Sequence, residues 1–574
     1  MNKRAARRRA LRIKRGIILG AAVLIIILII YLVIKYSPGR EKANLKKYFN
    51  ISSENDVGVV CQGILSDTVA KEYDGRIYVE YEFLKNSINP IFYFDYNENV
   101  LMYTLPTDVV SVDVGSSDYY ISKNKNSEDY IILKTDARTA YVALDFVQKF
   151  TNMDYQVFKD PARVLITCEW GNTEVADVKK NDAVRTLAGI KSPILTEAVK
   201  GDVVWVLGDE GGWKKVRTPD GYVGYIPGGS ISKTREENFT REFDEPQYTG
   251  IKKDKIINMV WNQVTNKTAN ASFLKSIAST KGVNVVGPTW FTLSDDEGNI
   301  RSLASSDNVN YAHQMNMEVW ATVNDIDGEG DANNVLSFSS KRQRLVNNII
   351  SEAIQYNIDG INIDLELIKQ DNADGYIQFV REMSVKCHNN GIVLSVDNYP
   401  PRNFNMFYNR RQQAKFADYV VVMAYDEYNK NSEEAGPVAS IGYVRESVEL
   451  TLQEVPAEKL IMGMPFYTRL WKETPNNGGE GSKGYDLSVT TVGMREAANR
   501  IEVNNATAEW QEDTGLYYAE FNYEGSTYKI WQEDERSIEE KLKVMKELGL
   551  AGVGCWKLGL ETDGIWDIIL KYVN

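Results

Sequence analysis

Two hydrophobic patterns of different kinds mark the two ends of the chain. Residues 16–34 form an uncharged run of 19 residues, GIILGAAVLIIILIIYLVI. As a helix this run spans about 29 Å, which matches a hydrocarbon core of about 30 Å. From about residue 250 to residue 574, short apolar runs instead alternate with amphipathic stretches. The first pattern predicts a transmembrane anchor over residues 16–35, and the second predicts an α/β domain.

The second pattern contains eight strand-like runs. Helix-like segments, such as residues 340–356 and 537–548, lie between them. Strand–helix alternation implies parallel strands with right-handed crossovers, and eight such units over residues 250–574 predict a (β/α)8 TIM barrel. The active site of such a barrel lies at the carboxyl ends of its strands. The predicted strands are residues 256–264, 283–293, 317–323, 360–366, 392–398, 419–426, 460–467 and 552–558.

Residues 40–170 have a third pattern, with short strands, frequent turns and little helix. A weak internal repeat is visible here, because residues 78–84 echo residues 141–147 in their order of aromatic, aliphatic and acidic positions. An internal repeat indicates a structural unit that occurs twice. We therefore expect a small module of α+β type in this part of the chain.

Residues 180–233 are predicted to form a separate small β unit. Glycine-containing turns separate its apolar runs, which is typical of short antiparallel strands. The polar residues 234–249 follow it and are predicted to be a linker to the barrel. The predicted strands of the unit are residues 203–207, 213–216 and 222–226.

Charge is distributed unevenly along the chain. The first 15 residues carry +8, so the other 559 residues carry −21 of the net charge of −13. This basic tip precedes the apolar run, and the positive-inside rule therefore places the N-terminus in the cytoplasm and the rest outside the cell. A cleavable signal peptide would have a shorter apolar core. Nucleic acid is not an expected partner of so acidic a body, since phosphate contacts need clustered Lys and Arg.

Few residues could ligate a metal ion. The chain has 2 His and 4 Cys, and neither an HExxH nor a CxxC motif occurs. We therefore expect no metal site and no cofactor. One disulfide, for instance Cys61–Cys168, is compatible with the sequence. The glycine-rich residues 478–484 lack the spacing of a phosphate-binding loop and are predicted to be a flexible loop.

The fourth predicted barrel strand carries the candidate chemistry. It reads DGINIDLE from Asp359 onward, and the side chains of a strand alternate between two faces. Asn362, Asp364 and Glu366 therefore share one face, opposite three apolar residues. Three polar groups inside a barrel are costly unless they bond to one another and are used. We expect this face to lie in the active site.

This strand resembles the signature of glycoside hydrolase family 18, Asp-Gly-x-Asp-x-Asp-x-Glu, which occurs in chitinases. Residues 423–426, MAYD, are similar to the family's Met-x-Tyr-Asp motif, and Trp556 is similar to the tryptophan on its eighth strand. Residues 288–291 and 463–471 resemble the spore-cortex and spore-coat branch of the family in Gram-positive bacteria. The resemblance covers residues 250–574 and implies an enzyme that cleaves glycans carrying N-acetyl groups.

The resemblance also implies the roles of individual residues. Glu366 would be the general acid, Asp364 would hold the acetamido N–H of the substrate, and Tyr425 would donate to the acetamido oxygen. That oxygen would attack the anomeric carbon, so that configuration is retained without a protein nucleophile. The implied substrate-binding residues are Asn362, Asp359, Asp426, Met423, Trp556, Trp290 and Tyr467.

One position departs from the family signature, because Asn362 stands where the family has its middle Asp. We expect the Asn362 amide to donate a hydrogen bond to ionised Asp364 and so to favour its charged form. This substitution should alter the pH profile and leave the reaction itself unchanged. Among the 11 tryptophans, Trp290, Trp320 and Trp471 are candidates either for walls that stack on sugars or for ordinary core.

The two modules that precede the barrel also resemble known ones. Residues 180–233, with a Gly-Gly-Trp turn and a closing GYVGYI, resemble a bacterial SH3 domain of the kind attached to cell-wall enzymes. Residues 40–170 resemble the copper-amine-oxidase N-terminal-like modules of bacterial surface proteins, although neither His lies in them and no copper is implied. The resemblance of the SH3-like module implies contact with the cell wall, and residues 40–170 are interpreted as a spacer or a wall-binding module.

The leading hypothesis is a membrane-anchored extracellular glycosidase. It would cut β-1,4 bonds in N-acetylglucosamine-containing polysaccharide, above all peptidoglycan, while residues 16–34 hold it in the membrane. Two alternatives remain open: a chitinase that acts on chitin oligomers, and a non-catalytic wall protein that only binds glycans. Hydrolysis of a chromogenic N-acetylglucosamine oligomer separates an enzyme from a binder.

Overall fold

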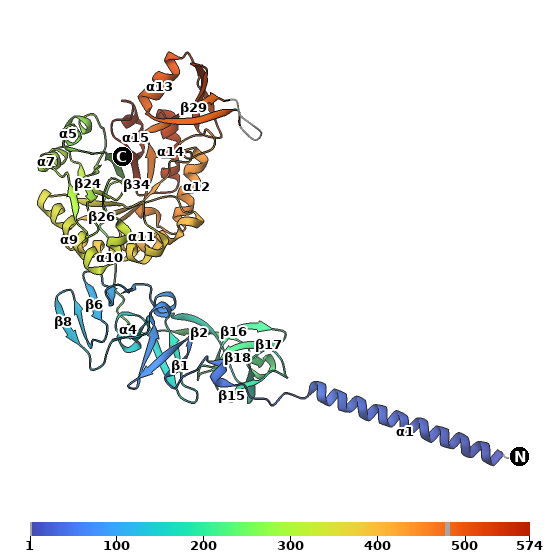
Figure 1. The fold of residues 1–574 in the computed structure, drawn as a ribbon. Coiled ribbons are helices and arrows are strands. Elements are labelled where there is room, and N and C mark those ends of the chain that lie inside the picture. Colours follow the sequence, from blue (N-terminus) through green and yellow to red (C-terminus); the bar gives the residue numbers. More distant parts are fainter. Residues whose placement is uncertain (1–2, 477–482) are drawn as a thin grey trace. The chain divides into compact units, whose positions relative to one another are not determined.

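The computed structural model describes residues 3–476 and 483–574 (Figure 1). The chain forms two compact units. The first comprises residues 1–92, 114–118 and 127–245, and the second comprises residues 93–113, 119–126 and 246–574. Most of the predicted glycine-rich loop, residues 478–482, lies outside the described residues.

The chain begins with one long helix, α1 (Lys3–Tyr36), none of whose residues is buried (Figure 1). By length and composition it could cross a membrane. The helix extends beyond the predicted span because Arg, Lys and Ala, which fill the basic tip, are good helix formers.

Both copies of the predicted repeat run from a strand into a helix. β3 (Arg76–Glu80) leads into α3 (Tyr81–Phe83), and β10 (Thr139–Ala143) leads into α4 (Leu144–Phe150). The two strands pair antiparallel in a seven-stranded sheet of order β11-β12-β1-β2-β3-β10-β9. The other strands of this sheet are β1 (Asp56–Cys61), β2 (Ile64–Tyr73), β9 (Leu133–Asp136), β11 (Asp154–Phe158) and β12 (Arg163–Thr167). In this module the free thiols of Cys61 and Cys168 lie with their Sγ atoms 3.8 Å apart.

The predicted SH3-like unit is an antiparallel sheet of order β15-β14-β18-β17-β16-β13-β19. Its core is a cluster of aliphatic side chains, among them Val204, Val216 and Ile226. β19 (Arg235–Phe239) pairs with β13 (Gly171–Asp177), which corrects the prediction of a linker from residue 234. An edge strand needs only backbone partners, so its polar sequence gave no signal. The other strands are β14 (Asp182–Arg185), β15 (Ile194–Ala198), β16 (Val203–Glu210), β17 (Trp213–Arg217) and β18 (Val223–Pro227).

The second unit is built on the predicted barrel, and all eight expected strands are present. They pair in parallel in the order β21-β20-β34-β28-β27-β26-β25-β24, and pairing of β21 with β24 closes the barrel. The strands are β20 (Ile257–Asn262), β21 (Val285–Pro288), β24 (Glu318–Asn324), β25 (Gly360–Asp364), β26 (Val393–Asn398), β27 (Tyr419–Met423), β28 (Leu460–Pro465) and β34 (Gly552–Trp556).

Helices surround these strands (Figure 1). α9 is representative: its buried face includes Leu345, Val346 and Ile349, and it ends at Asn357 in the left-handed conformation, φ 57°. Asn tolerates this conformation better than most residues, which makes it a suitable helix terminator. The barrel helices include α7 (Ser306–Gln314), α9 (Ser339–Tyr356), α10 (Ala373–Asn389), α11 (Arg410–Phe416), α12 (Ile441–Leu452) and α14 (Glu535–Glu547).

Residues 467–532 form an insertion between β28 and α14 that the sequence pattern did not predict. It is an antiparallel sheet of order β30-β29-β33-β32-β31, with α13 (Met494–Val503) packed on it (Figure 1). The insertion has its own core, which includes Leu470, Ala497 and Ile530. Its strands are β29 (Tyr467–Pro475), β30 (Tyr485–Gly493), β31 (Glu509–Gln511), β32 (Leu516–Tyr523) and β33 (Ser526–Gln532).

Part of the predicted 40–170 module instead belongs to the second unit. A small sheet is formed there by β4 (Phe92–Asp95), β5 (Val100–Thr104), β6 (Val109–Asp113), β7 (Asp118–Ile121) and β8 (Asn124–Ser127). The backbone N–H groups of Ser339 and Ser340, at the start of α9, donate to the carboxylates of Asp95 and Glu98 at 2.6 and 2.7 Å. Two acids thus cap a barrel helix from 240 or more residues away in the chain.

Candidate active site

The interior face of β25 meets that of β26 at the centre of the barrel. Asn362 is 0% exposed, and its Nδ2 donates to Ser395 Oγ at 3.0 Å and to Asp397 Oδ1 at 2.7 Å. Its Oδ1 accepts from Trp261 Nε1 at 2.9 Å and from Thr322 Oγ1 at 3.2 Å. The NH₂ group and the oxygen of the Asn362 amide therefore both form hydrogen bonds, and together they bind four neighbouring side chains.

This arrangement corrects the expectation that Asn362 donates to Asp364. The physical reason is the barrel's parallel register, which sets Asn362 beside Ser395 of the adjacent strand. Residues two apart on one strand are about 6.6 Å apart, whereas adjacent strands lie about 4.8 Å apart. The amide therefore finds its partners across the sheet.

Asp364 lies at the carboxyl end of β25 and is buried. Within residues 3–476 and 483–574 its Oδ1 has no hydrogen-bond partner. Burial raises the pKa of Asp364 well above its usual range, and the nearby carboxylates of Asp397 and Glu366 raise it further. These surroundings favour the protonated form of the carboxyl, and a hydrogen-bond donor that reaches its Oδ1 would favour the charged form.

Asp397, on β26, is a member of the site that the sequence analysis missed. Burial and the charge of Glu366 raise its pKa to about 8, while the hydrogen bond from Asn362 opposes the rise. The signal was present in the sequence: Ser395 and Asp397 alternate with apolar residues in the predicted strand 392–398, in the same way as Asn362 and Asp364.

Glu366 lies two residues beyond the end of β25, and its backbone is held by hydrogen bonds. Its N–H and that of Leu367 donate to the Asp325 carboxylate at 3.0 and 3.2 Å. Burial raises the pKa of the Glu366 carboxyl, a hydrogen bond from the Tyr399 hydroxyl opposes this, and the charges of Asp325 and Asp426 add to the rise. A carboxyl with a raised pKa near the end of a barrel strand is suited to general acid catalysis.

Tyr425 follows β27 and lies beside Tyr467, with ring centroids 6.3 Å apart. Burial raises the pKa of its hydroxyl well above the usual range, followed by the effects of Tyr467 and Asp364. The hydroxyl therefore remains protonated and available as a donor. Tyr467 in turn donates to Asp426 at 2.6 Å, so three of the predicted residues form one connected group.

Met423 and Trp556 end β27 and β34 at the same end of the barrel as Asp364. Trp556 is partly exposed and packs beside Trp261, whose ring centroid is 6.1 Å from its own. Trp261 is also the residue that donates to Asn362. The predicted floor tryptophan and the central polar network are therefore linked by one side chain.

Two predicted substrate-binding residues lie elsewhere. Trp290 is 0% exposed, donates to Asn270 at 3.0 Å and packs on Phe273, so it is a core residue. Asp359 precedes β25, at the opposite end of that strand from Asp364, and accepts from the Val319 N–H at 2.8 Å. Trp320 and Trp471 are likewise buried in the core. Sequence motifs could not distinguish these residues from exposed ones because burial depends on packing across elements.

Comparison with known proteins identifies the domain that carries this site. Residues 261–561 match the family Glycosyl hydrolases family 18, and residues 180–232 match the Bacterial SH3 domain. The chain belongs to glycosyl hydrolase family 18. It is a family 18 glycoside hydrolase that also carries a bacterial SH3 domain.

Relatives of this hydrolase include proteins of spore-forming bacteria. The Cortical fragment-lytic enzyme of Bacillus subtilis (strain 168) is 28% identical over 247 residues, which are 42% of this chain and 56% of that protein. The chain thus spans only about half of that relative's length. A second Bacillus subtilis (strain 168) protein, Uncharacterized glycosylase YvbX, is 25% identical over 304 residues, 50% of this chain and 84% of the relative.

A solved structure shares the fold of this family 18 hydrolase. The Bacillus cereus spore cortex-lytic enzyme SleL aligns with a TM-score of 0.50 and 19% identity, over 59% of this chain and 78% of that one.

Within residues 3–476 and 483–574, no group of three or more His, Cys, Asp and Glu side chains is arranged to hold a metal ion.

A groove of about 540 Å³ is lined by Tyr425, one of the predicted catalytic residues, and by Asp426. Residues that follow β26 and β27, together with residues of α12 and of the insertion, complete its lining. Tyr399, which bonds to Glu366, lines it as well. The other lining residues are Pro400, Arg402, Phe404, Asn405, Asn429, Lys430, Asn431, Tyr443 and Arg469.

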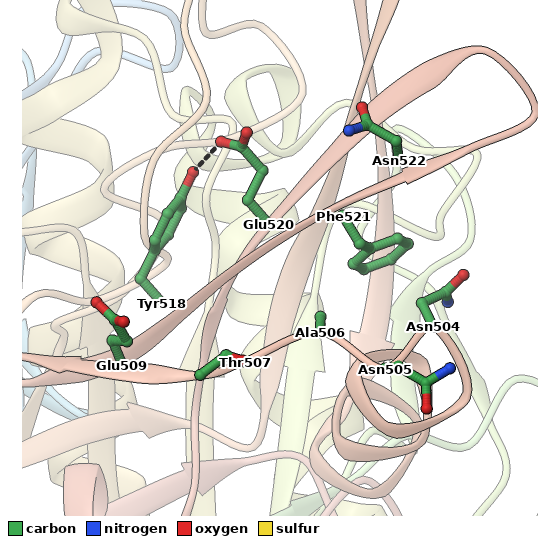
Figure 2. Close-up of a pocket in the computed structure, with 9 residues that line it drawn as sticks. All are labelled: Asn504, Asn505, Ala506, Thr507, Glu509, Tyr518, Glu520, Phe521 and Asn522. Atoms are coloured by element: carbon green, nitrogen blue, oxygen red, sulfur yellow. Dashed lines mark hydrogen bonds between the residues drawn. The ribbon is translucent and has the colours of Figure 1, made fainter.

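A second hollow, of about 480 Å³, lies within the insertion (Figure 2). Three asparagines, Asn504, Asn505 and Asn522, contribute to its lining, and no cation does. Figure 2 shows the Tyr518 hydroxyl directed at Glu520, to which it donates at 2.6 Å. None of the catalytic residues lines this hollow, so the groove is the better candidate for substrate.

Proposed function

We propose that this hydrolase cuts β-1,4 bonds next to N-acetylglucosamine by a substrate-assisted, retaining mechanism, and that peptidoglycan is its substrate. One observation carries the proposal. Glu366 has a raised pKa, and Asp364, with an unpartnered oxygen, lies at the same end of the barrel as the Tyr425 hydroxyl. An acid, an acceptor and a donor are the three groups that this mechanism requires.

In the first step Glu366 gives its proton to the glycosidic oxygen while the acetamido oxygen of the substrate attacks the anomeric carbon. The bond to the leaving sugar breaks and an oxazolinium ring forms. The acetamido N–H donates to Asp364 Oδ1, and this hydrogen bond favours the charged carboxylate, which stabilises the positive ring. The Tyr425 hydroxyl donates to the acetamido oxygen and holds it in line for the attack.

In the second step a water molecule attacks the same anomeric carbon from the side that the leaving sugar vacated. Glu366, now ionised, accepts a proton from this water and is ready for the next cycle. Two inversions at one carbon give net retention of configuration. The scheme uses no protein nucleophile, so a substrate without the N-acetyl group should not be cut.

The rest of the chain supports a substrate in the cell wall. The first half of α1 carries eight cations and its second half is the apolar run, so the helix would anchor the protein with its N-terminus in the cytoplasm and the barrel outside. The SH3 domain would add contacts to the wall polymer. Protease added to intact wall-stripped cells should then degrade the barrel, and a mature N-terminus beyond residue 34 would contradict the anchor.

Mass spectrometry of the products tests the proposed reaction. Purified peptidoglycan and chitin oligomers are digested side by side, and NMR follows the anomer formed first. We expect fragments with reducing-end N-acetylglucosamine in the β configuration from peptidoglycan. Release from chitin oligomers alone would indicate a chitinase, and binding without any product would indicate a glycan-binding wall protein.

A further inference from the structure

We propose that the groove beside Tyr425 recognises a carboxylate group on the glycan, so that the enzyme favours an acidic N-acetylated polymer over neutral chitin. The inference rests on the proposed function, since it assumes that the glycan cut at Glu366 continues into this groove. The feature of the substrate that the groove would select is the carboxylate group.

The charge of the groove differs from that of the rest of the protein. Three cations, Arg402, Lys430 and Arg469, line it against a single carboxylate, Asp426. The chain outside its basic tip carries −21. A cationic concavity on so acidic a body focuses attraction for anions at one place.

Two of the three cations remain available to a ligand. Lys430 is exposed and forms no ion pair within the described ranges 3–476 and 483–574. Arg402 pairs with Glu446 at 2.8 Å, but the Glu446 side chain is 60% exposed. Ion pairs this exposed contribute little, so a substrate carboxylate can replace Glu446 at small cost.

Arg469 is held more firmly, because its Nη2 donates to Asp426 at 2.6 Å. Its Nε, however, is buried and has no partner within the described residues. A buried guanidinium N–H without an acceptor is costly, which favours a ligand that supplies one.

The cations are not needed to balance the catalytic carboxylates. The main influences on the pKa of Glu366 and Asp364 are burial and other carboxylates, together with the Tyr399 hydroxyl at Glu366. The positive charge of the groove is therefore left for another anion.

The groove is also shaped for a sugar chain that leads away from Glu366. Tyr399 connects the Glu366 carboxyl to the groove, because its hydroxyl forms a hydrogen bond with Glu366 and its side chain lines the groove. Its side chain is 41% exposed, and that of Phe404 is 77% exposed. Exposed aromatic rings offer apolar faces to sugars. Aromatic faces beside cations fit a glycan whose units carry carboxylates, whereas the hollow of Figure 2 offers amides and acids.

The test compares two forms of one polymer. Peptide-free peptidoglycan strands keep their lactyl carboxylates, and a matched batch has these converted to neutral amides. We expect wild type to show a kcat/KM about ten-fold higher on the carboxylate form at low ionic strength, as one charge-assisted hydrogen bond provides. The double variant Arg402→Gln/Lys430→Gln should bring this ratio close to one. The double variant Lys281→Gln/Lys543→Gln is the charge-matched control and should keep the ratio, because these exposed lysines pair with Asp567 and Glu540 and do not line the groove.

A ratio near one for wild type, or the same ratio in wild type and the double variant, would overturn the inference. Its failure can be told apart from failure of the proposed function. If neither polymer is cut, calorimetric binding of both forms to Glu366→Gln still reports the preference. Tighter binding of the carboxylate form, weakened by the double variant, supports the groove, whereas equal binding refutes it.

Discussion

The catalytic unit contains two groups of buried acids with opposite surroundings. At the active site Asp364 and Asp397 lie near Glu366, and no cation is among the main influences on their pKa values. Where the small sheet meets α9 and α10, Glu382 and Asp95 instead surround Arg342, which is 0% exposed. Arg342 Nε donates to Glu382 Oε1 at 3.2 Å, and its Nη1 is 4.0 Å from Asp95 Oδ2.

The difference between the two groups shows that buried carboxyl groups serve two purposes in this protein. Burial raises the pKa of Glu382, but Arg342 and Gln378 oppose that rise and favour a carboxylate that is charged and fixed. The active-site acids have only hydrogen-bond donors to oppose burial, and the pKa of Asp397 rises to about 8. The first arrangement favours charged carboxylates in fixed positions, and the second favours protonated carboxyls, which is typical of functional sites.

The largest effect is expected from Glu366→Gln. The change keeps the shape of the side chain and removes the transferable proton, so kcat should fall about 10²–10⁴-fold on a substrate with a poor leaving group. Circular dichroism should match wild type, and thermal unfolding should show a protein at least as stable, since the substitution relieves repulsion among carboxylates. Turnover close to wild type would remove Glu366 from the role of acid.

Arg342→Met tests the second group. It should lower the free energy of unfolding by about 3–5 kcal/mol, because it leaves two buried acids without their cation. Arg344→Met, two residues along the same helix, is the control; this side chain is 48% exposed and pairs with the exposed Glu297, so the expected loss is below about 1 kcal/mol. Urea denaturation of the detergent-solubilised chain measures both, and equal losses would contradict the contrast.

Asn362→Asp adds one more carboxyl to the buried acids of the active site. It removes the donor to Asp397 and places a carboxyl at the same contact, so the pair should share one proton and the acid limb of the pH–rate profile should move to higher pH. Ser395→Ala, which removes a partner of Asn362 without changing charge, should leave that limb in place. Superimposable profiles for wild type and Asn362→Asp would show that position 362 only fills space.

The last prediction concerns stability as a function of pH. A carboxyl whose pKa rises on folding, from about 4 to about 8 for Asp397, keeps its proton in the folded state after the unfolded chain has lost it. Its contribution is complete below pH 4 and is lost as pH rises toward 8. Thermal unfolding should therefore show wild type losing stability between pH 5 and 8, with a shallower slope for Asp397→Asn. Parallel slopes would contradict the raised pKa.

The sequence by itself determined the long apolar N-terminal helix, the eight barrel strands and the strand that leads to Glu366. These features depend on local periodicity: a 19-residue apolar run, and alternation of polar and apolar residues along strands. Each of these features is encoded by residues that are neighbours in the sequence, so it could be predicted without knowledge of distant contacts. The strand carrying Asp364 could be read in the same way.

Only the tertiary structure decided which polar groups meet. Asn362 binds Trp261, 101 residues away, and Asp397 on the next strand rather than Asp364 on its own. The small sheet that the sequence assigned to the N-terminal module caps α9 through Asp95, 244 residues away. Trp290 is core because of what packs around it. Such contacts follow from strand register and from packing between elements. They join residues that are far apart in the sequence, so a local pattern of residues does not predict them.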